Sequence, residues 1–469
     1  MLMICISTGQ NITNLIPAVQ YNITSLLLIE SETAKNKSWS NGIIEVLLKR
    51  NVIIKSPIYL STKFNSDINK IKEIIKSSLP NEPVIFNMGG GQKPHIIAMW
   101  ELFKERKKDI ACYADQDKKG ILQIWEYKEN ELISTRQDIN VNLTAEEIFT
   151  TFGFKVVPDF KLIYGKGINY RNDTLDLFRE KEFRELLFNI PKVNDDNSNN
   201  QFTLLELDDF IKNKRLQLLN DIENKLIPKF HLNEHLFTNF LTDLNFKKIV
   251  YNTLIKTTLN TLSQGLRNEL PIIKVNLNNP LLIELAGNTV VPLNDSTFNR
   301  ITGFYKPAFY FEDICTKRMV TMLNNSNHNI TEAFANIKIE KENVIVAEYD
   351  ILLVTNEGKI VAYDAKTFDF ESKDIDARLY NLEKGSGFYR KFNAIIPFAV
   401  NDIQNNILPP VLLELPFKLM KKNIDFFVID DDIHQSFFIK KDKNKIIVNQ
   451  QNDKDSIKCK LFETCLEYT

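Results

Sequence analysis

Short runs of apolar residues alternate with amphipathic segments over the first 150 residues of the chain. The clearest helical pattern covers residues 68–77, and it lies between two of the strand-like runs. Strands that alternate with helices predict a parallel, doubly wound sheet, so we expect an α/β, Rossmann-like fold here. Ligands of such sheets bind beyond the carboxyl ends of the strands, which directs attention to the loops after the first strand and after Phe86. The strand-like runs are residues 3–7, 25–29, 52–56, 84–87 and 110–113.

The pattern changes twice further along the chain. Helical patterns rich in Phe, Leu and Asn follow the first part and are broken by a polar, loop-like run at residues 193–200. After this mostly helical connector, the pattern predicts a helix at 309–323, two or three strands within 337–366, a helix near 377–388 and strands near 395–400 and 424–429. We therefore expect an N-terminal domain at residues 1–150, a connector at 151–300 and a second α/β domain at 301–469.

Charge limits how the chain can bind nucleic acid. The formal net charge is −1, whereas proteins that coat nucleic acid carry a strong basic excess that neutralises phosphates. Any nucleic-acid-binding surface is therefore expected to be confined to a small part of the protein. Two basic runs, residues 104–108 and 440–445, are candidates, although such runs are more often solvated faces.

Apolar runs and cysteines indicate the cellular compartment of the protein. No uninterrupted apolar stretch approaches the roughly 20 residues of a membrane helix, so no membrane span or membrane partner is expected. The N-terminus lacks the basic flank and cleavage site of a signal peptide and is typical of a buried first strand. The five cysteines are scattered and form no C-x-x-C pair, which predicts unpaired thiols and a cytoplasmic location.

Two β-type runs flank Asn356-Glu357-Gly358, a short connection with glycine where a hairpin needs a positive φ. If these three residues are the loop, Thr355 pairs with Lys359 and Asp350 lies directly opposite Asp364. Opposed side chains on one face of a sheet lie about 4.5–5.5 Å apart at Cβ, so the two carboxylates can share one cation. Lys366 points the same way as Asp364, because the two are two residues apart on one strand.

Charged groups that converge from buried strands are costly unless they are paired or bind a metal, so a function is the better explanation. Two carboxylates provide the hard oxygen ligands that Mg²⁺ or Mn²⁺ prefers, and such an ion activates water and stabilises charge on a phosphate. The point charge of a lysine suits the remaining role of holding the attacking water or the developing negative charge.

This arrangement resembles the PD-(D/E)xK nuclease superfamily, which places an acid on one strand, a second acid and x-Lys on the next, and often an acid on the preceding helix. Asp350, Asp364-Ala365-Lys366 and Glu312 stand at those positions. The resemblance implies that Asp350, Asp364, Lys366 and Glu312 are catalytic, and that Asp350, Asp364 and Glu312 hold the metal. The alternative is an ordinary hairpin with surface acids.

Two loops at the predicted ligand edge of the first sheet carry the second candidate site. Gly89-Gly90-Gly91 follows a strand and precedes a helix, so its backbone can approach a phosphate and the helix N-terminus favours an anion. Lys93 adds a positive charge. The loop lacks the G-x-x-x-x-G-K-[ST] pattern of a Walker A motif, so we do not expect ATP hydrolysis. The candidate binding residues are Thr8, Gly9, Gln10, Asn11, Asn87, Gly89, Gly90, Gly91, Gln92 and Lys93.

Together these loops resemble the CRISPR-associated Rossmann fold (CARF) domain, in which they bind a cyclic oligoadenylate at a homodimer interface. Gln92 departs from the family, which usually has threonine there. Joined to the nuclease-like end, the chain resembles the CARF nucleases of type III CRISPR antiviral defence. The resemblance implies a homodimer, activation by cyclic oligoadenylate with cyclic tetra-adenylate as the expected ring, and metal-dependent cleavage of DNA and/or RNA.

Two other functions stay open at this point. A ligand-responsive transcription regulator would bind DNA through the connector and would need no metal site at Asp350 and Asp364. A metallopeptidase would use His231, Glu234 and His235, which match an H-x-x-E-H pattern of zinc enzymes but lack a distinctive third ligand. The sequence alone distinguishes neither DNA from RNA nor tetra- from hexa-adenylate.

Overall fold

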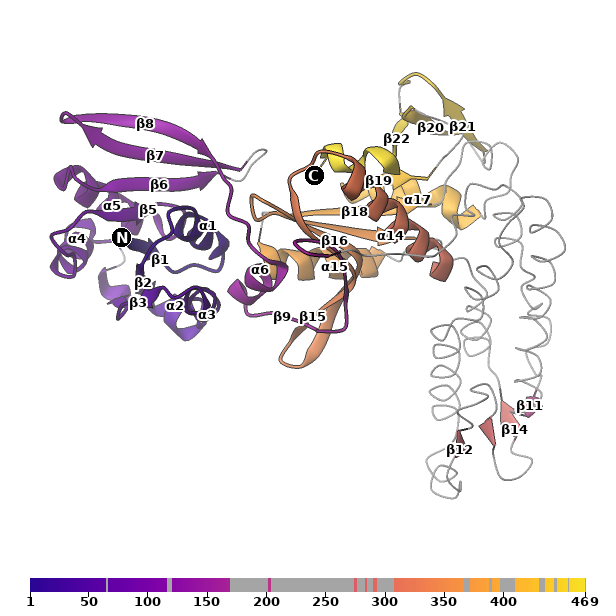
Figure 1. Cartoon of the computed structure of the whole chain (residues 1–469), viewed down its shortest axis with the longest axis horizontal. Helices are drawn as coiled ribbons and strands as arrows, with labels where there is room; N and C mark the ends of the chain where they lie inside the picture. Colours follow the sequence, from indigo (N-terminus) through magenta and orange to yellow (C-terminus); the bar gives the residue numbers. More distant parts are fainter. Residues whose placement is uncertain are drawn as a thin grey trace.

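A computed structural model gives the fold of the chain (Figure 1). It describes residues 1–64, 66–115, 120–168, 201–203, 274–275, 283–284, 290–292, 308–366, 372–387, 390–396, 410–429, 435–442, 445–453 and 455–468. The expected helical connector falls mostly outside these residues, as do His231, Glu234 and His235. Four short strands of that region pair as β11 (Gln201–Thr203) with β14 (Val290–Pro292) and β12 (Lys274–Val275) with β13 (Ile283–Glu284).

The N-terminal sheet has the order β3-β2-β1-β5-β6-β7-β8, with β4 paired to β2. The neighbouring strands β3, β2, β1, β5 and β6 run parallel to one another. This confirms the expected Rossmann-like α/β fold. The strands are β1 (Leu2–Ile6), β2 (Ser25–Ser31), β3 (Ile53–Ile54), β4 (Ile58–Leu60), β5 (Val84–Asn87), β6 (Ile110–Asp115), β7 (Ile121–Lys128) and β8 (Glu131–Asp138). The helices are α1 (Ile12–Gln20), α2 (Glu32–Asn36), α3 (Asn41–Lys49), the 3-10 helix η1 (Thr62–Phe64), α4 (Ile68–Ser77) and α5 (Lys93–Glu105).

An antiparallel hairpin extends this sheet beyond the predicted parallel strands. β7 pairs with β6, and β8 pairs with β7. Nearly every residue of β8 is exposed, so its sequence carries no alternation of apolar and polar side chains. Sequence periodicity therefore gave no sign of the hairpin.

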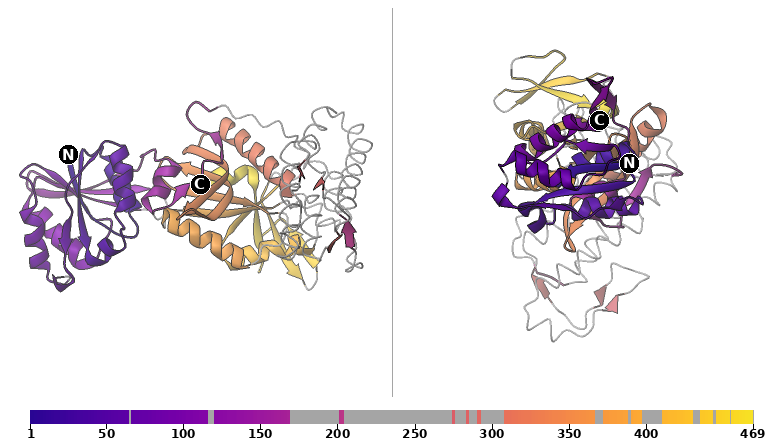
Figure 2. Two further views of the ribbon diagram at one scale, coloured as in Figure 1. Left: turned by 90° about the horizontal axis from the view of Figure 1, so that it is seen from below. Right: turned by 90° about the vertical axis from the view of Figure 1, so that its left-hand side faces the viewer.

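A short helix, α6 (Ala145–Thr151), leads from the first sheet to the second and lies between them (Figures 1 and 2). It begins with a capping box in which the Thr144 and Glu147 side chains bond each other's backbone N–H groups, a pattern that fixes the start of a helix. The strands β9 (Lys155–Val156) and β10 (Lys161–Tyr164) follow and pair with the second sheet. Residues just after position 150 thus contribute to the C-terminal fold.

The second sheet has the order β10-β15-β16-β17-β18-β19-β22-β20-β21, with β9 paired to β15. Its strands are β15 (Ile330–Lys341), β16 (Val344–Thr355), β17 (Ile360–Ala365), β18 (Arg390–Ile396), β19 (Asp425–Val428), β20 (Phe437–Asp442), β21 (Lys445–Asn449) and β22 (Ile457–Leu461). Its helices are α14 (Ala308–Asn325), α15 (Ser372–Ser386), α17 (Pro410–Lys421) and the 3-10 helix η5 (Phe462–Tyr468). The predicted order of helix, strands, helix and strands is therefore confirmed.

One hydrophobic core continues from the first sheet into the second. It includes Met3 and Leu28 of the N-terminal domain and Tyr349 and Leu352 of β16. A second core, containing Ile4 and Phe103, lies on the other face of the N-terminal sheet. Because apolar burial is the dominant stabilising term of folded proteins, the two sheets are held together by the same interaction that stabilises each of them.

Hydrogen bonds reinforce this junction at the loop of the β16–β17 hairpin. The Val141 N–H donates to the Asn356 carbonyl at 2.7 Å, and the Gly120 N–H donates to Glu357 Oε2 at 3.2 Å. All five cysteines are buried thiols; the sequence predicted thiols rather than disulfides but not their burial. Within the described residues, no helix combines the length and the apolar character needed to cross a membrane.

Candidate functional sites

The predicted hairpin is present, and its register is the predicted one. Ile351 pairs with Tyr363, and Val354 pairs with Ile360. The Thr355 N–H donates to the Lys359 carbonyl at 3.0 Å, which closes the loop at Asn356-Glu357-Gly358. Gly358 has a φ of +81°, a conformation that glycine adopts without steric cost. Continued by one residue past Ile351 and Tyr363, this register sets Asp350 opposite Asp364.

The two acids and the lysine of the hairpin converge, and both acids are buried. Lys366 Nζ lies 3.3 Å from Asp364 Oδ2 and 3.9 Å from Asp350 Oδ2. The Ala365 N–H donates to Asp350 Oδ2 at 2.7 Å, which fixes the orientation of that carboxylate. Strand alternation therefore brings together the three side chains that the sequence singled out, although their chemical roles stay a prediction.

Glu312 on α14 joins this cluster. Its pKa is raised to about 8, first by burial and then by the negative charge of Asp350, against the opposing charge of Lys366. The pKa of Asp350 is raised to about 7, again first by burial and then by Asp364, against Lys366 and Arg378. Buried carboxylates that lie close together repel one another when both are ionised, and a cation between them relieves that repulsion.

Arg378 on α15 is a member of the cluster that the sequence did not indicate. Its guanidinium forms an ion pair with Asp364 Oδ2 and donates to the Glu348 carbonyl at 2.9 Å. The Glu348 side chain is itself exposed, and its Oε1 lies 3.6 Å from Lys338 Nζ. A helix after an acidic strand was expected here, but which of its side chains meets the hairpin depends on how the helix docks.

The acids fit a divalent cation of the Mg²⁺ type. Asp364 Oδ1 is buried and has no hydrogen-bond partner among the described residues, so one carboxylate oxygen is left for a ligand. Mg²⁺ is usually held by one or two protein carboxylates, with water and substrate phosphate completing its shell. In the described part of the chain, no group of three or more His, Cys, Asp and Glu side chains is arranged to hold a metal. Asp350, Asp364 and Glu312, the acids that the sequence assigned to the metal, stay the predicted ligands.

At the other site, the loop after β1 is shaped by Asn11. Its Oδ1 accepts from the Thr8 N–H at 3.2 Å, and its Nδ2 donates to the Trp39 carbonyl at 2.6 Å. The Gln10 N–H donates to Thr8 Oγ1 at 3.0 Å. Gly9 lies against the Trp39 ring: a Cβ at Gly9 would stand 3.7 Å from Trp39 Cε2. The loop is therefore held in one shape by its own polar side chains.

Asn87, at the end of β5, ties the two loops together. Its Nδ2 donates to the Thr13 carbonyl at 2.9 Å and to Asn14 Oδ1 at 2.7 Å, and its Oδ1 accepts from the Gly89 N–H at 3.0 Å. Asn87 is buried. Because its amide already bonds both loops, the structure supports a positioning role for it.

The glycine run packs directly on the first loop. A Cβ at Gly90 would stand 2.6 Å from Thr8 Cγ2, and Gly91 has a φ of +107°. Only glycine fits this close approach without moving a neighbour. The helix α5 begins directly afterwards at Lys93, and its N-cap residue Gln92 makes no side-chain cap. Both residues are exposed, so the helix N-terminus offers amide groups and a lysine of the kind that favour an anion.

Several buried polar atoms at this sheet edge have no hydrogen-bond partner within the described chain. They are Ser7 Oγ, Gln10 Oε1 and both ring nitrogens of His95. Burial also lowers the pKa of His95, which favours the neutral imidazole. Orphaned buried polar groups are uncommon and call for a partner such as water or a ligand. His95 was missed from the sequence because a single histidine inside a helix is usually a packing residue.

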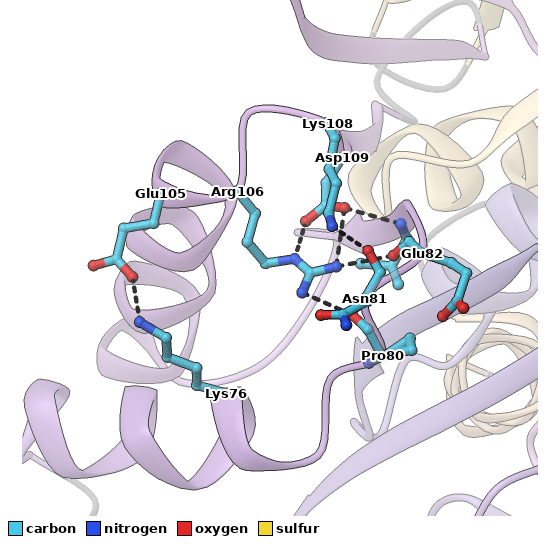
Figure 3. Close-up of polar contacts among 9 residues, drawn as sticks. Lys76, Pro80, Asn81, Glu82, Glu105, Arg106, Lys108 and Asp109 are labelled. Atoms are coloured by element: carbon cyan, nitrogen blue, oxygen red, sulfur yellow. Dashed lines mark hydrogen bonds and ion pairs between the residues drawn. The ribbon is translucent and has the colours of Figure 1, made fainter.

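The basic run at residues 104–108, a candidate grip for nucleic acid, is largely engaged within the protein (Figure 3). Arg106 pairs with Asp109 at 2.6 Å and donates to the carbonyls of Pro80 and Glu82. Lys108 donates to the Asn81 carbonyl. These bonds anchor the turn before β6, so Arg106 serves the fold.

Comparisons with known proteins identify the N-terminal part. Residues 2–144 match the family model described as the Card1 CARF domain, so this part of the chain is a CARF domain. A comparison with curated proteins gave no match.

Among solved structures, the fold is similar to protein VC1899 from Vibrio cholerae, with 14% identity, a TM-score of 0.48 and coverage of 91% of this chain and 93% of that one. It is also similar to Can2 from Sulfobacillus thermosulfidooxidans in complex with cyclic tetra-adenylate, with 14% identity, a TM-score of 0.45 and coverage of 90% and 98%. A type III CRISPR defence DNA nuclease activated by cyclic oligoadenylate matches at 9% identity and a TM-score of 0.41, over 85% of this chain and 46% of that chain.

Proposed function

We propose that this protein is a nuclease of type III CRISPR antiviral defence, switched on by a cyclic oligoadenylate and dependent on a divalent metal. The observation that carries the proposal is the buried cluster of Asp350, Asp364 and Lys366 in the same chain as a CARF domain. A domain that only relayed a signal would gain nothing from burying two repelling carboxylates.

The activator site is proposed at the two loops of the CARF domain. Their surfaces touch at Thr8 and Gly90, the amides of the α5 N-terminus lie beside them, and Lys93 adds positive charge. The unpartnered atoms of Ser7, Gln10 and His95 provide hydrogen-bonding groups for a polar ligand. Phosphates and adenine edges offer the matching charge and polarity, and cyclic tetra-adenylate is the ring we propose, bound across a homodimer.

The cutting site is proposed at the hairpin. Asp350 and Asp364, with Glu312 beside them, would hold Mg²⁺ or Mn²⁺, which when bound supplies an activated water and neutralises charge on a phosphate. Lys366 is oriented by both carboxylates, so its ammonium is held ready for the attacking water or the phosphate oxygen. The substrate is nucleic acid, DNA and/or RNA, and the proposed location is the cytoplasm.

The test is a cleavage assay with plasmid, single-stranded DNA and RNA. Each cyclic oligoadenylate is added in turn, with Mg²⁺ or Mn²⁺. We expect cleavage only with both an activator and a metal, and none from Asp364→Asn. Asp376→Asn is the matched control, because Asp376 is an exposed acid of the same domain that pairs with Lys422. Activator binding without cleavage of any substrate would contradict the nuclease proposal and favour a ligand-responsive regulator.

A further inference from the structure

The helix α15 contacts both candidate sites. At its C-terminal end, Gly387 has a φ of +70°, and a Cβ there would overlap Gln10 Oε1 of the proposed activator loop. Gly385 packs on α6, with its Cβ position 2.9 Å from Phe149 Cδ1. The amide oxygen of Gln10 has no partner in the described structure, so this contact offers it a surface but no hydrogen bond.

The middle of the same helix is fixed to the nuclease hairpin. Arg378 forms an ion pair with Asp364, and its carbonyl accepts from the Tyr349 hydroxyl at 3.3 Å. Asn381 Nδ2 donates to the Val346 carbonyl at 2.5 Å. Nine residues separate Arg378 from Gly387, which corresponds to roughly 14 Å of helix. A rigid element of one helix therefore joins the Gln10 loop to a buried acid of the metal site.

The charge of Arg378 opposes a metal ion. Asp364 already pairs with Lys366, and Arg378 adds a second cation to the same carboxylate oxygen. A divalent ion bound by Asp364 would meet the repulsion of a guanidinium within a few ångströms, in a setting where water screens little. Lys366 directly follows β17, whereas Arg378 lies on a helix whose C-terminal end contacts the CARF domain.

We propose that α15 couples the two sites, and that Arg378 holds Asp364 in a state that disfavours the metal until the activator binds. The activator engages Gln10, α15 shifts, and the guanidinium leaves the carboxylate. This inference rests on the proposed function. The coupling is an equilibrium property, because a ligand shifts two states by its differential affinity for them.

The test measures Mn²⁺ binding to the full chain by calorimetry, without nucleic acid, with and without cyclic tetra-adenylate. We expect the activator to tighten Mn²⁺ binding to the wild type by about tenfold or more, the order set by removing one nearby cation. Arg378→Gln should bind Mn²⁺ with this higher affinity even without activator, and Arg378→Lys, which keeps the charge, should behave like the wild type. Equal Mn²⁺ affinity of Arg378→Gln and wild type without activator would overturn the proposal.

A second variant addresses the helix without touching the charge cluster. Gly387→Ala adds a Cβ against Gln10, so it should displace the helix end and raise the Mn²⁺ affinity measured without activator. Lys384→Ala is the matched control, since Lys384 is an exposed residue of the same helix, and it should leave the affinity unchanged. The same Mn²⁺ affinity for Gly387→Ala as for wild type would contradict a coupling through α15.

Binding of cyclic tetra-adenylate is measured separately, in the absence of metal. If the wild type binds the activator and its Mn²⁺ affinity does not change, the coupling is wrong while the proposed sensor survives. If the wild type does not bind cyclic tetra-adenylate or another cyclic oligoadenylate, both the sensor and the coupling are wrong.

Discussion

At the scale of single residues, the two buried acids of the hairpin explain most of the chemistry that we assign to the chain. Burial, and then the negative charge of Asp364, raise the pKa of Asp350; both carboxylates lie beside Lys366, and Asp364 keeps one oxygen without a hydrogen-bond partner among the described residues. Replacing either acid changes the charge that the other acid and Lys366 meet, which makes the substitutions informative.

Removing the charge of Asp364 should abolish cleavage while leaving activator binding intact. In Asp364→Asn the proposed metal site loses an anionic ligand, and Lys366 loses its ion pair with Asp364. We expect the cleavage rate to fall by at least about a hundredfold, the order of loss when one electrostatic group of an active site is removed. The measurement is the cleavage rate at saturating activator, together with calorimetric binding of cyclic tetra-adenylate. Full activity of this variant would remove Asp364 from the site.

The raised pKa values predict how pH affects stability and metal binding. The pKa of Asp350 rises from 3.8 in the unfolded chain to about 7 in the folded one, and that of Glu312 rises from 4.5 to about 8. Between these limits the folded state binds more protons than the unfolded state, so the metal-free protein should lose stability as pH rises from about 4 to 8. Mn²⁺ competes with these protons, so its binding should tighten over pH 6 to 8.

Thermal unfolding and Mn²⁺ titration at several pH values check this. The variant Asp350→Asn lacks one of the two titrating carboxyl groups. Its thermal stability and its Mn²⁺ affinity should therefore both depend less steeply on pH. A metal affinity that is constant between pH 6 and 8 would contradict the raised pKa values.

At the scale of elements, the sequence predicted those parts whose pattern is local. The hairpin register followed from the alternation of β16 and β17 and from the Asn-Glu-Gly loop, because a tight loop and a buried face leave one pairing. The hairpin β7–β8 was not predicted, since an exposed strand carries no periodic signal. Arg378 was not predicted either, because it meets Asp364 only through the docking of α15, a long-range contact.

The loop glycine Gly358 tests how the hairpin depends on its turn. Its φ of +81° strains any other residue, and a Cβ would stand 3.0 Å from Leu143 Cδ1 across the domain junction. Gly358→Ala should lower the free energy of unfolding by about 1–3 kcal/mol, the cost of a residue held in this conformation. Denaturant unfolding of the full chain measures it.

The matched control is Gly153→Ala. Gly153 has a similar φ of +78°, but nothing lies within 4 Å of its Cβ position. Gly153→Ala therefore reports the conformational cost alone, and the larger loss at Gly358 reports the crowding against Leu143. Equal losses at the two positions would show that the junction tolerates the extra methyl group.

The contact between the two CARF loops predicts the behaviour of a sensor variant. Gly90→Ala puts a Cβ 2.6 Å from Thr8 Cγ2, so the two loops must separate and the amides of the proposed activator site must move. We expect the activator concentration for half-maximal cleavage to rise by about tenfold, which is a loss of about 1.4 kcal/mol in binding. Lys70→Ala, an exposed lysine of α4, serves as the control. Unchanged half-activation in Gly90→Ala would show that this loop is only a turn.

At the scale of the whole molecule, one continuous core joins the CARF domain to the second sheet, and the end of α15 contacts the Gln10 loop. The loop of the β16–β17 hairpin bonds two segments of the first domain, at Gly120 before β7 and at Val141 after β8. The turn of the hairpin therefore lies against the CARF domain. The acids of the hairpin lie further along the same two strands. A change in the CARF domain therefore has a short physical route to the acids.

The most direct test of this account is the cleavage rate of the wild-type protein as a function of cyclic tetra-adenylate concentration, with Mn²⁺ present and with Mn²⁺ chelated. We predict a saturable rise in rate with Mn²⁺, no cleavage after chelation, and no cleavage by Asp364→Asn at any activator concentration. Cleavage that proceeds at the same rate with and without the activator, or that survives both chelation and the loss of Asp364, would contradict it.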